Sequence, residues 1–210
     1  MKKTIITLTT WIIYIIWLIF IKSTALSIGN FLSHTIILMM ILFLNYHFLK
    51  ESFLIFKNKE NRWFNIIVYI IILIIILVIG KLLVRTISNN LNYTIKDNIL
   101  LLLFKHSING ALWIFFTTVL FYPVIEELLF RKSLRLIIKN KILFFIISSL
   151  ITWYFSLTLI NPHLNELVFS IPIFFTSIYL AIIYIKTDNI WFTIIARMIL
   201  NIITLIIMIF

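Results

Sequence analysis

The sequence predicts an all-α fold, a polytopic bundle of about seven transmembrane helices in a single membrane domain, residues 1–210. Two observations lead to this prediction. First, 63% of the 210 residues are hydrophobic and 12% are charged, with a mean hydropathy of +1.16, whereas soluble domains average about 45–50% apolar and 25% charged residues. Second, the apolar residues fall in long runs, and a spanning helix needs about 20 mostly apolar residues. We therefore expect a membrane protein and no nucleic-acid partner, despite the formal charge of +11.

Seven apolar runs have the length of a span, and they lie at residues 4–27, 31–49, 64–88, 110–130, 142–160, 167–186 and 190–210. The first run follows Lys2 and Lys3 as in a signal peptide, but it is longer than the apolar core of about 7–15 residues that signal peptides have. We therefore expect it to be retained as the first helix. Segment 88–109 combines asparagine-rich sequence with a short apolar stretch, which predicts an outer loop carrying an interfacial helix.

The distribution of basic residues predicts the orientation, because short cytoplasmic loops are enriched in lysine and arginine. With the N-terminus in the cytoplasm, twelve of the 18 basic residues lie on the cytoplasmic side, five lie outside, and Arg197 lies within a span. This orientation makes segments 50–63 and 131–141 cytoplasmic loops and places 161–166 outside. The basic loops predict contact with anionic lipids at the cytoplasmic face. The sequence has no cysteine, which excludes disulfides, thiolate metal sites and cysteine nucleophiles.

Ionisable side chains inside a span are costly, so each of them is a candidate functional residue. Glu126 and Glu127 lie near the end of the fourth apolar run, and Arg131 follows them. On a helix Glu127 can pair with Arg131 at the i,i+4 spacing. Adjacent side chains point about 100° apart, so Glu126 would face elsewhere and be free to act as a general base. The alternative is that all three residues lie at the membrane border and extend toward water.

The order of these residues resembles a family motif. Pro123 precedes a Glu-Glu-x-x-x-Arg pattern that is formed by Glu126, Glu127 and Arg131, with Leu-Leu-Phe in between. This pattern is similar to the first motif of the CPBP family, also called Abi, which comprises CAAX proteases and bacteriocin-processing enzymes. These proteins are multi-helix intramembrane endopeptidases. The resemblance implies a CPBP/Abi-like core over residues 110–205.

Two further motifs of the family occur here in altered form. The family's Phe-x-x-x-His corresponds to Thr152 and Ser156, and its His-x-x-x-Asn corresponds to Arg197 and Asn201. If consecutive helices pair as antiparallel hairpins, a rise of about 1.5 Å per residue brings these positions to the depth of Glu126. We therefore expect a shared polar cavity lined by Glu126, Glu127, Arg131, Ser156, Arg197 and Asn201.

The resemblance implies an intramembrane endopeptidase that cleaves peptides or membrane-protein tails at the cytoplasmic side of the membrane. We expect the protein itself to be a multi-pass protein of the bacterial plasma membrane. In that role Glu126 would activate water. Arg131 would orient Glu127, and Asn201 would hold or polarise the scissile carbonyl.

The replacement of both family histidines, by Ser156 and Arg197, predicts impaired activity. An arginine offers only hydrogen-bond donors and cannot be deprotonated in a protein, and Arg197 can bridge to Glu126 or Glu127. The metal dependence of the family does not carry over without the histidines, so the cofactor stays unknown. A second hypothesis is therefore a catalytically inactive family member, acting in bacteriocin self-immunity or as a regulatory binding protein.

A small transporter is the third hypothesis, since buried carboxylates can couple transport to protons. Transporters commonly show internal repeats, and the sequence shows none. The four histidines are expected at span borders or in loops rather than at the site, and they are His34, His47, His106 and His163.

Overall fold

The structure is a computed structural model that describes residues 2–22, 28–90, 112–113, 115–158, 167–168 and 170–209. The elements are helices in chain order: α1 (Lys2–Lys22), α2 (Ile28–Leu44), α3 (Tyr46–Asn58), α4 (Arg62–Asn90), η1 (Phe116–Phe121), α7 (Tyr122–Glu127), η2 (Leu128–Ser133), α8 (Leu134–Ile137), α9 (Lys141–Thr158), α11 (Ile171–Thr187) and α12 (Ile190–Ile209). These ranges contain no strand, and the predicted all-α fold is confirmed.

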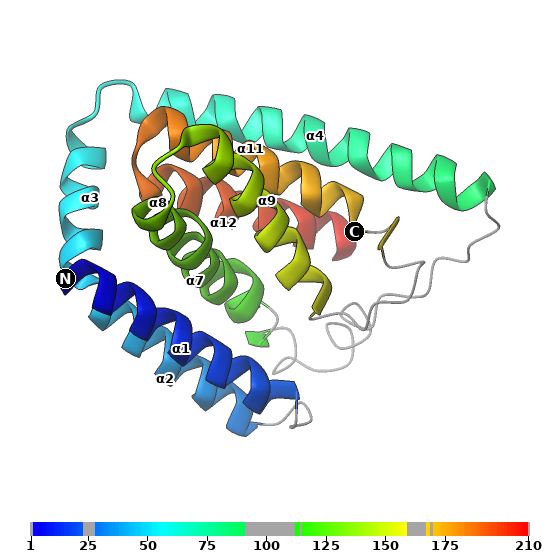
Figure 1. Cartoon of the computed structure of the whole chain (residues 1–210). Helices are drawn as coiled ribbons and strands as arrows, with labels where there is room; N and C mark the ends of the chain where they lie inside the picture. The colour runs from blue at the N-terminus through cyan, green and yellow to red at the C-terminus, as the bar shows by residue number, and fades with distance from the viewer. Residues whose placement is uncertain are drawn as a thin grey trace.

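The helices are arranged around α11 and α12. Figure 1 shows α1 and α2 side by side as a hairpin, with α3 leading from that pair to the long helix α4. α11 contacts both α4 and α9. α12 contacts α3 and α4 on one side and the η1–α7 segment on the other. The last helix therefore faces the segment that bears the two glutamates.

Two of the described helices are long and apolar enough to cross a membrane, Arg62–Asn89 in α4 and Ile190–Ile207 in α12. A third span would arise if Leu32–Leu44 and Tyr46–Asn58, which are bent by 72° against each other, acted as one. The spans expected in α1, α9 and α11 correspond to shorter apolar helices. The count of about seven spans therefore stays a prediction.

The expectation of a loop over 50–63 is wrong for residues 50–58, because α3 (Tyr46–Asn58) includes them. Leu49 and Ser52 are buried on one face of α3, at the spacing of an amphipathic helix. The Asn189 side chain, in the turn between α11 and α12, donates a hydrogen bond to the Ser52 carbonyl at 2.7 Å. The helix is thus fixed by a residue that is distant in sequence.

Other expectations fall on parts of the chain that the structure does not describe. α4 continues to Asn90, so the first residues of segment 88–109 are helical. The interfacial helix expected later in that segment, with His106, lies outside the described residues, as does the turn 161–166 with His163.

The helix that bears the glutamates contains a π-helical turn on each side of α7. In η1 the Tyr122 N–H donates to the carbonyl of Thr117, five residues earlier, and Pro123 comes next with no N–H of its own. In η2 the Ser133 hydroxyl donates to the Leu128 carbonyl at 3.0 Å. π-helical turns are rare and frequent at functional sites, and these two bracket the glutamates.

Close packing joins the helices that surround this segment. α4 approaches α11 at Gly80, where an added Cβ would lie 2.9 Å from the Pro172 Cα. On the other side α1 buries Tyr14 and Trp17 in a hydrophobic cluster that includes Phe130.

Candidate active site

The paired glutamates are buried on α7, with 4% of Glu126 and 0% of Glu127 exposed. The predicted i,i+4 pair is present, since Arg131 Nε lies 3.6 Å from Glu127 Oε2. Arg197 reaches both carboxylates from α12, with Nη1 3.2 Å from Glu127 Oε1 and Nη2 in contact with Glu126 Oε2. Two arginines therefore balance two buried glutamates. Glu126 forms the bridge to Arg197 that the sequence also allows, and it does not stand unpaired as a free general base would.

Arg131 is fully buried and joins three helices. Its Nη1 donates to the Ser148 hydroxyl, to the Ser148 carbonyl at 3.2 Å and to the Thr152 hydroxyl at 2.9 Å. Its Nη2 donates to the Ser177 carbonyl at 3.0 Å. Because a buried charge is tolerated only when it is paired and hydrogen-bonded, this set explains how η2 holds Arg131 between α9 and α11. The guanidinium in turn fixes Glu127.

Asn201 lies one helical turn after Arg197 on α12. Its Nδ2 donates to the Thr118 carbonyl in η1 at 2.6 Å. The amide thus ties α12 to the helix of the glutamates, beside the ion pairs of Arg197.

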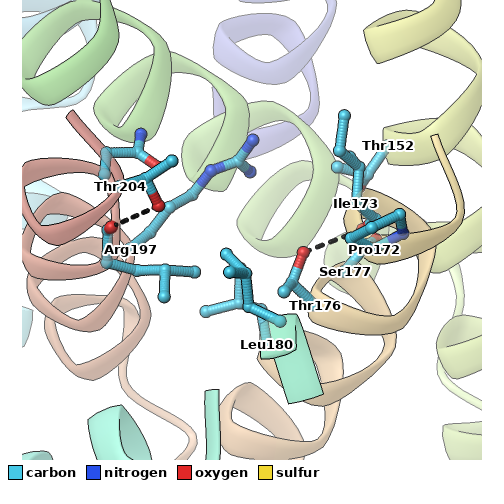
Figure 2. Close-up of a pocket in the computed structure, with 11 residues that line it drawn as sticks. Thr152, Pro172, Ile173, Thr176, Ser177, Leu180, Arg197 and Thr204 are labelled. Carbon is cyan, nitrogen blue, oxygen red and sulfur yellow. Dashed lines mark hydrogen bonds between the residues drawn. The ribbon is translucent and has the colours of Figure 1, made fainter. Parts of the chain in front are cut away.

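A cavity of about 220 Å³ lies next to these residues. Its lining comes from four helices and consists of Leu77, Thr152, Pro172, Ile173, Thr176, Ser177, Leu180, Arg197, Leu200, Asn201 and Thr204. Figure 2 shows Arg197 and Thr204 on one wall, opposite Thr176 and Ser177 on the other. The two glutamates are not part of this lining, because Arg197 lies between them and the cavity.

The structure thus brings together five of the six residues expected at the site. Glu126, Glu127, Arg131 and Arg197 form one ion-pair cluster. Of the five whose side chains the structure describes, only Arg197 and Asn201 reach the cavity wall. The sixth, Ser156, belongs to α9, but its side chain lies outside the described part of the structure.

Sequence reasoning overlooked the hydroxyl groups that solvate Arg131. Ser148 and Thr152 follow each other at an i,i+4 spacing in one apolar run, and Ser177 lies in the next. Polar residues in apolar spans commonly bond across helices, so their presence was a usable signal. The sequence alone did not indicate which cationic side chain these hydroxyls would bind.

Residues 108–203 match the family model described as type II CAAX prenyl endopeptidase Rce1-like. The chain carries an Rce1-like domain of the CPBP family. This confirms the resemblance that the Glu-Glu-x-x-x-Arg motif indicated, and it supports an intramembrane protease at the level of the family. The comparison with curated proteins and the comparison with solved structures each gave no match.

The Rce1-like domain does not offer a metal-binding set among the residues that the structure describes. No group of three histidine, aspartate or glutamate side chains is close enough there to hold an ion. The two glutamates that could contribute are bound by arginines, and the side chain of Arg197 has no lone pair for a metal.

Proposed function

We propose that this Rce1-like protein binds a peptide or membrane-protein tail and hydrolyses it slowly or not at all. One observation carries the proposal: Arg197 pairs with Glu126 and Glu127 while it also lines the cavity. A ligand in the cavity therefore meets the guanidinium before it meets either carboxylate. An arginine cannot exchange a proton near neutral pH, so it does not replace the proton shuttle that a histidine supplies.

The walls of the cavity favour a peptide as the ligand. The hydroxyls of Thr176 and Thr204 each donate to a carbonyl of their own helix at 2.9 Å, so that their oxygens remain as acceptors. Arg197 adds donors, and apolar residues such as Leu77 and Leu180 complete the wall. A peptide backbone offers both N–H and C=O groups, whereas a hydrocarbon chain would leave the polar atoms unpaired, which is costly in a buried site.

Hydrolysis at the cytoplasmic side is the second candidate function. The family match favours an endopeptidase, and the side follows from the predicted orientation of the chain. In this case Glu126 acts as general base for water and Arg131 orients Glu127. Asn201 then polarises the scissile carbonyl. This candidate requires the ion pair between Glu126 and Arg197 to open when the substrate binds.

Binding without cleavage suits a bacteriocin self-immunity protein or a regulatory protein, which must hold a partner and release it intact. We place the protein in the plasma membrane of a bacterium as a multi-pass protein with a cytoplasmic N-terminus. The support is the excess of basic residues in the segments assigned to the cytoplasm. The same residues favour anionic lipids as partners.

A binding assay tests the proposal. Protein in lipid nanodiscs is titrated with a fluorescent, prenylated peptide that ends in a CAAX sequence. We expect saturable binding by the wild type, unchanged binding by Glu126→Ala, and at least tenfold weaker binding by Thr176→Phe, which fills the cavity. Thr86→Phe is the matched control, because Thr86 lies exposed on α4.

Three results would overturn this account. The first is the absence of saturable binding by the folded wild type. The second is equal affinity in the Thr176→Phe and Thr86→Phe variants, which would place the ligand outside the cavity. The third concerns the chemistry of the ligand. Competition by the free prenyl alcohol as effective as competition by the peptide would show that a hydrocarbon chain is the ligand.

A further inference from the structure

Helix α1 packs along the face of the helix that bears Glu126. Tyr122, Glu126 and Phe130 follow each other at a spacing of four residues, which places them on one face of a helix. The Trp17 ring lies 6.3 Å from the Tyr122 ring, and the Tyr14 ring lies 6.4 Å from the Phe130 ring. Because these contacts lie on either side of Glu126, the interval of α1 from Tyr14 to Trp17 is level with that carboxylate.

Two hydrogen-bond donors in this interval have no hydrogen-bond partner among the described residues. They are the Tyr14 hydroxyl and the Trp17 Nε1–H, and the two residues are 0% and 1% exposed. The Tyr14 hydroxyl also lies within electrostatic range of Glu126 and Arg197. Buried polar groups in native proteins are nearly always hydrogen-bonded, to protein or to ordered water. Each of these donors therefore calls for an acceptor.

The chemistry of the three groups defines what fits between them. Tyr14 and Trp17 present donors. Glu126 keeps lone pairs beyond the one that Arg197 takes, because a carboxylate has about four acceptor sites. A species that accepts from two donors and donates to a carboxylate must carry an O–H, which a carbonyl oxygen does not. Water meets this requirement, and buried waters typically make about three hydrogen bonds to groups that are otherwise unsatisfied.

We propose that Tyr14 and Trp17 bind one buried water molecule that donates a hydrogen bond to the Glu126 carboxylate. The site lies on the α1 side of Glu126, opposite the cavity, and α1 precedes the residues that match the family. Tyr14 is then a positioning residue that holds Glu126 in its pair with Arg197. The inference does not depend on peptide binding.

The first test is a double-mutant cycle on protein in lipid. Tyr14→Phe keeps the ring and removes the hydroxyl, and we expect the folding equilibrium constant to fall about fivefold, as for one buried hydrogen bond. In a Glu126→Ala background the same change should cost less than about twofold, because the water has lost its acceptor. In a Glu127→Ala background the full effect should remain. Tyr154→Phe is the control, since Tyr154 is 62% exposed and its loss should have no effect.

The second test detects the water in a protein with its native hydrogen-bonding groups. 3-Fluorotyrosine at position 14 should show cross-relaxation between its fluorine and a water molecule that exchanges slowly with bulk, and Trp17→Phe should abolish this signal. An additive cycle between Tyr14→Phe and Glu126→Ala would overturn the proposal, because it would mean that the two side chains are not coupled. Coupling without the water signal would also overturn it, in favour of a direct hydrogen bond.

Discussion

Among the described residues Arg197 alone binds both glutamates, and its replacement by alanine removes both ion pairs. Glu127 keeps Arg131 at 3.6 Å, whereas Glu126, which is 4% exposed, keeps no other ion pair among the described residues. Breaking a buried ion pair by removal of one partner costs about 3–5 kcal/mol. Asn201→Ala, one turn away, removes a single hydrogen bond to the Thr118 carbonyl, which is worth about 1 kcal/mol. The free energy of unfolding should therefore fall by about 2–4 kcal/mol more in the first variant.

The unfolding of both variants can be followed by tryptophan fluorescence in mixed micelles, with the wild type as reference. If the loss in Arg197→Ala arises from the uncompensated charge of Glu126, adding Glu126→Gln should restore part of the stability. Equal losses in the Arg197→Ala and Asn201→Ala variants would refute this reasoning. So would a double variant that is less stable than Arg197→Ala alone, because the buried carboxylate would then not be the source of the cost.

Three other predictions concern different parts of the chain. A cysteine introduced at Asn165 should react with an impermeant thiol reagent in intact cells while Lys139→Cys does not, because the basic loops are predicted to be cytoplasmic; the reverse pattern would invert the topology. Arg131→Met should lower the free energy of unfolding by about 3–5 kcal/mol, since Glu127 loses one of its two cations and the buried acceptors on α9 and α11 lose their donor, and Lys139→Met should change it little; similar effects of the two would contradict the role of the buried guanidinium. Gly80→Ala should destabilise the protein in the same unfolding assay, by about 1–3 kcal/mol, because the new Cβ would press on α11; an unchanged unfolding curve would show that the helices separate without cost.

Much of the site could be predicted from the sequence because it depends on local spacing. The i,i+4 relation of Glu127 and Arg131 follows from the geometry of one helix, and the apolar runs set the all-α class. The position of Asn201 one turn after Arg197 is likewise a property of α12 alone. These features need no knowledge of how distant helices meet.

The rest depends on contacts between segments that are far apart in the chain. The sequence allows Arg197 to bridge to Glu126 or Glu127, but it does not show that the guanidinium contacts both carboxylates at once. The position of α3 involves a hydrogen bond from Asn189, which lies more than a hundred residues later. The sequence does not distinguish Tyr14 from the other aromatic residues of the first span, whereas the structure buries its hydroxyl without a hydrogen-bond partner among the described residues and packs its ring against Phe130.

The measurement that tests the central claim most directly is cleavage of the prenylated peptide under single-turnover conditions, by protein in lipid. The claim is that the pair between Arg197 and Glu126 keeps the glutamate from acting on a bound peptide. It predicts that the wild type cleaves no faster than Glu126→Ala, although both bind the peptide. Robust cleavage by the wild type that Glu126→Ala abolishes would contradict the claim and show that this chain is a protease without the family's histidines.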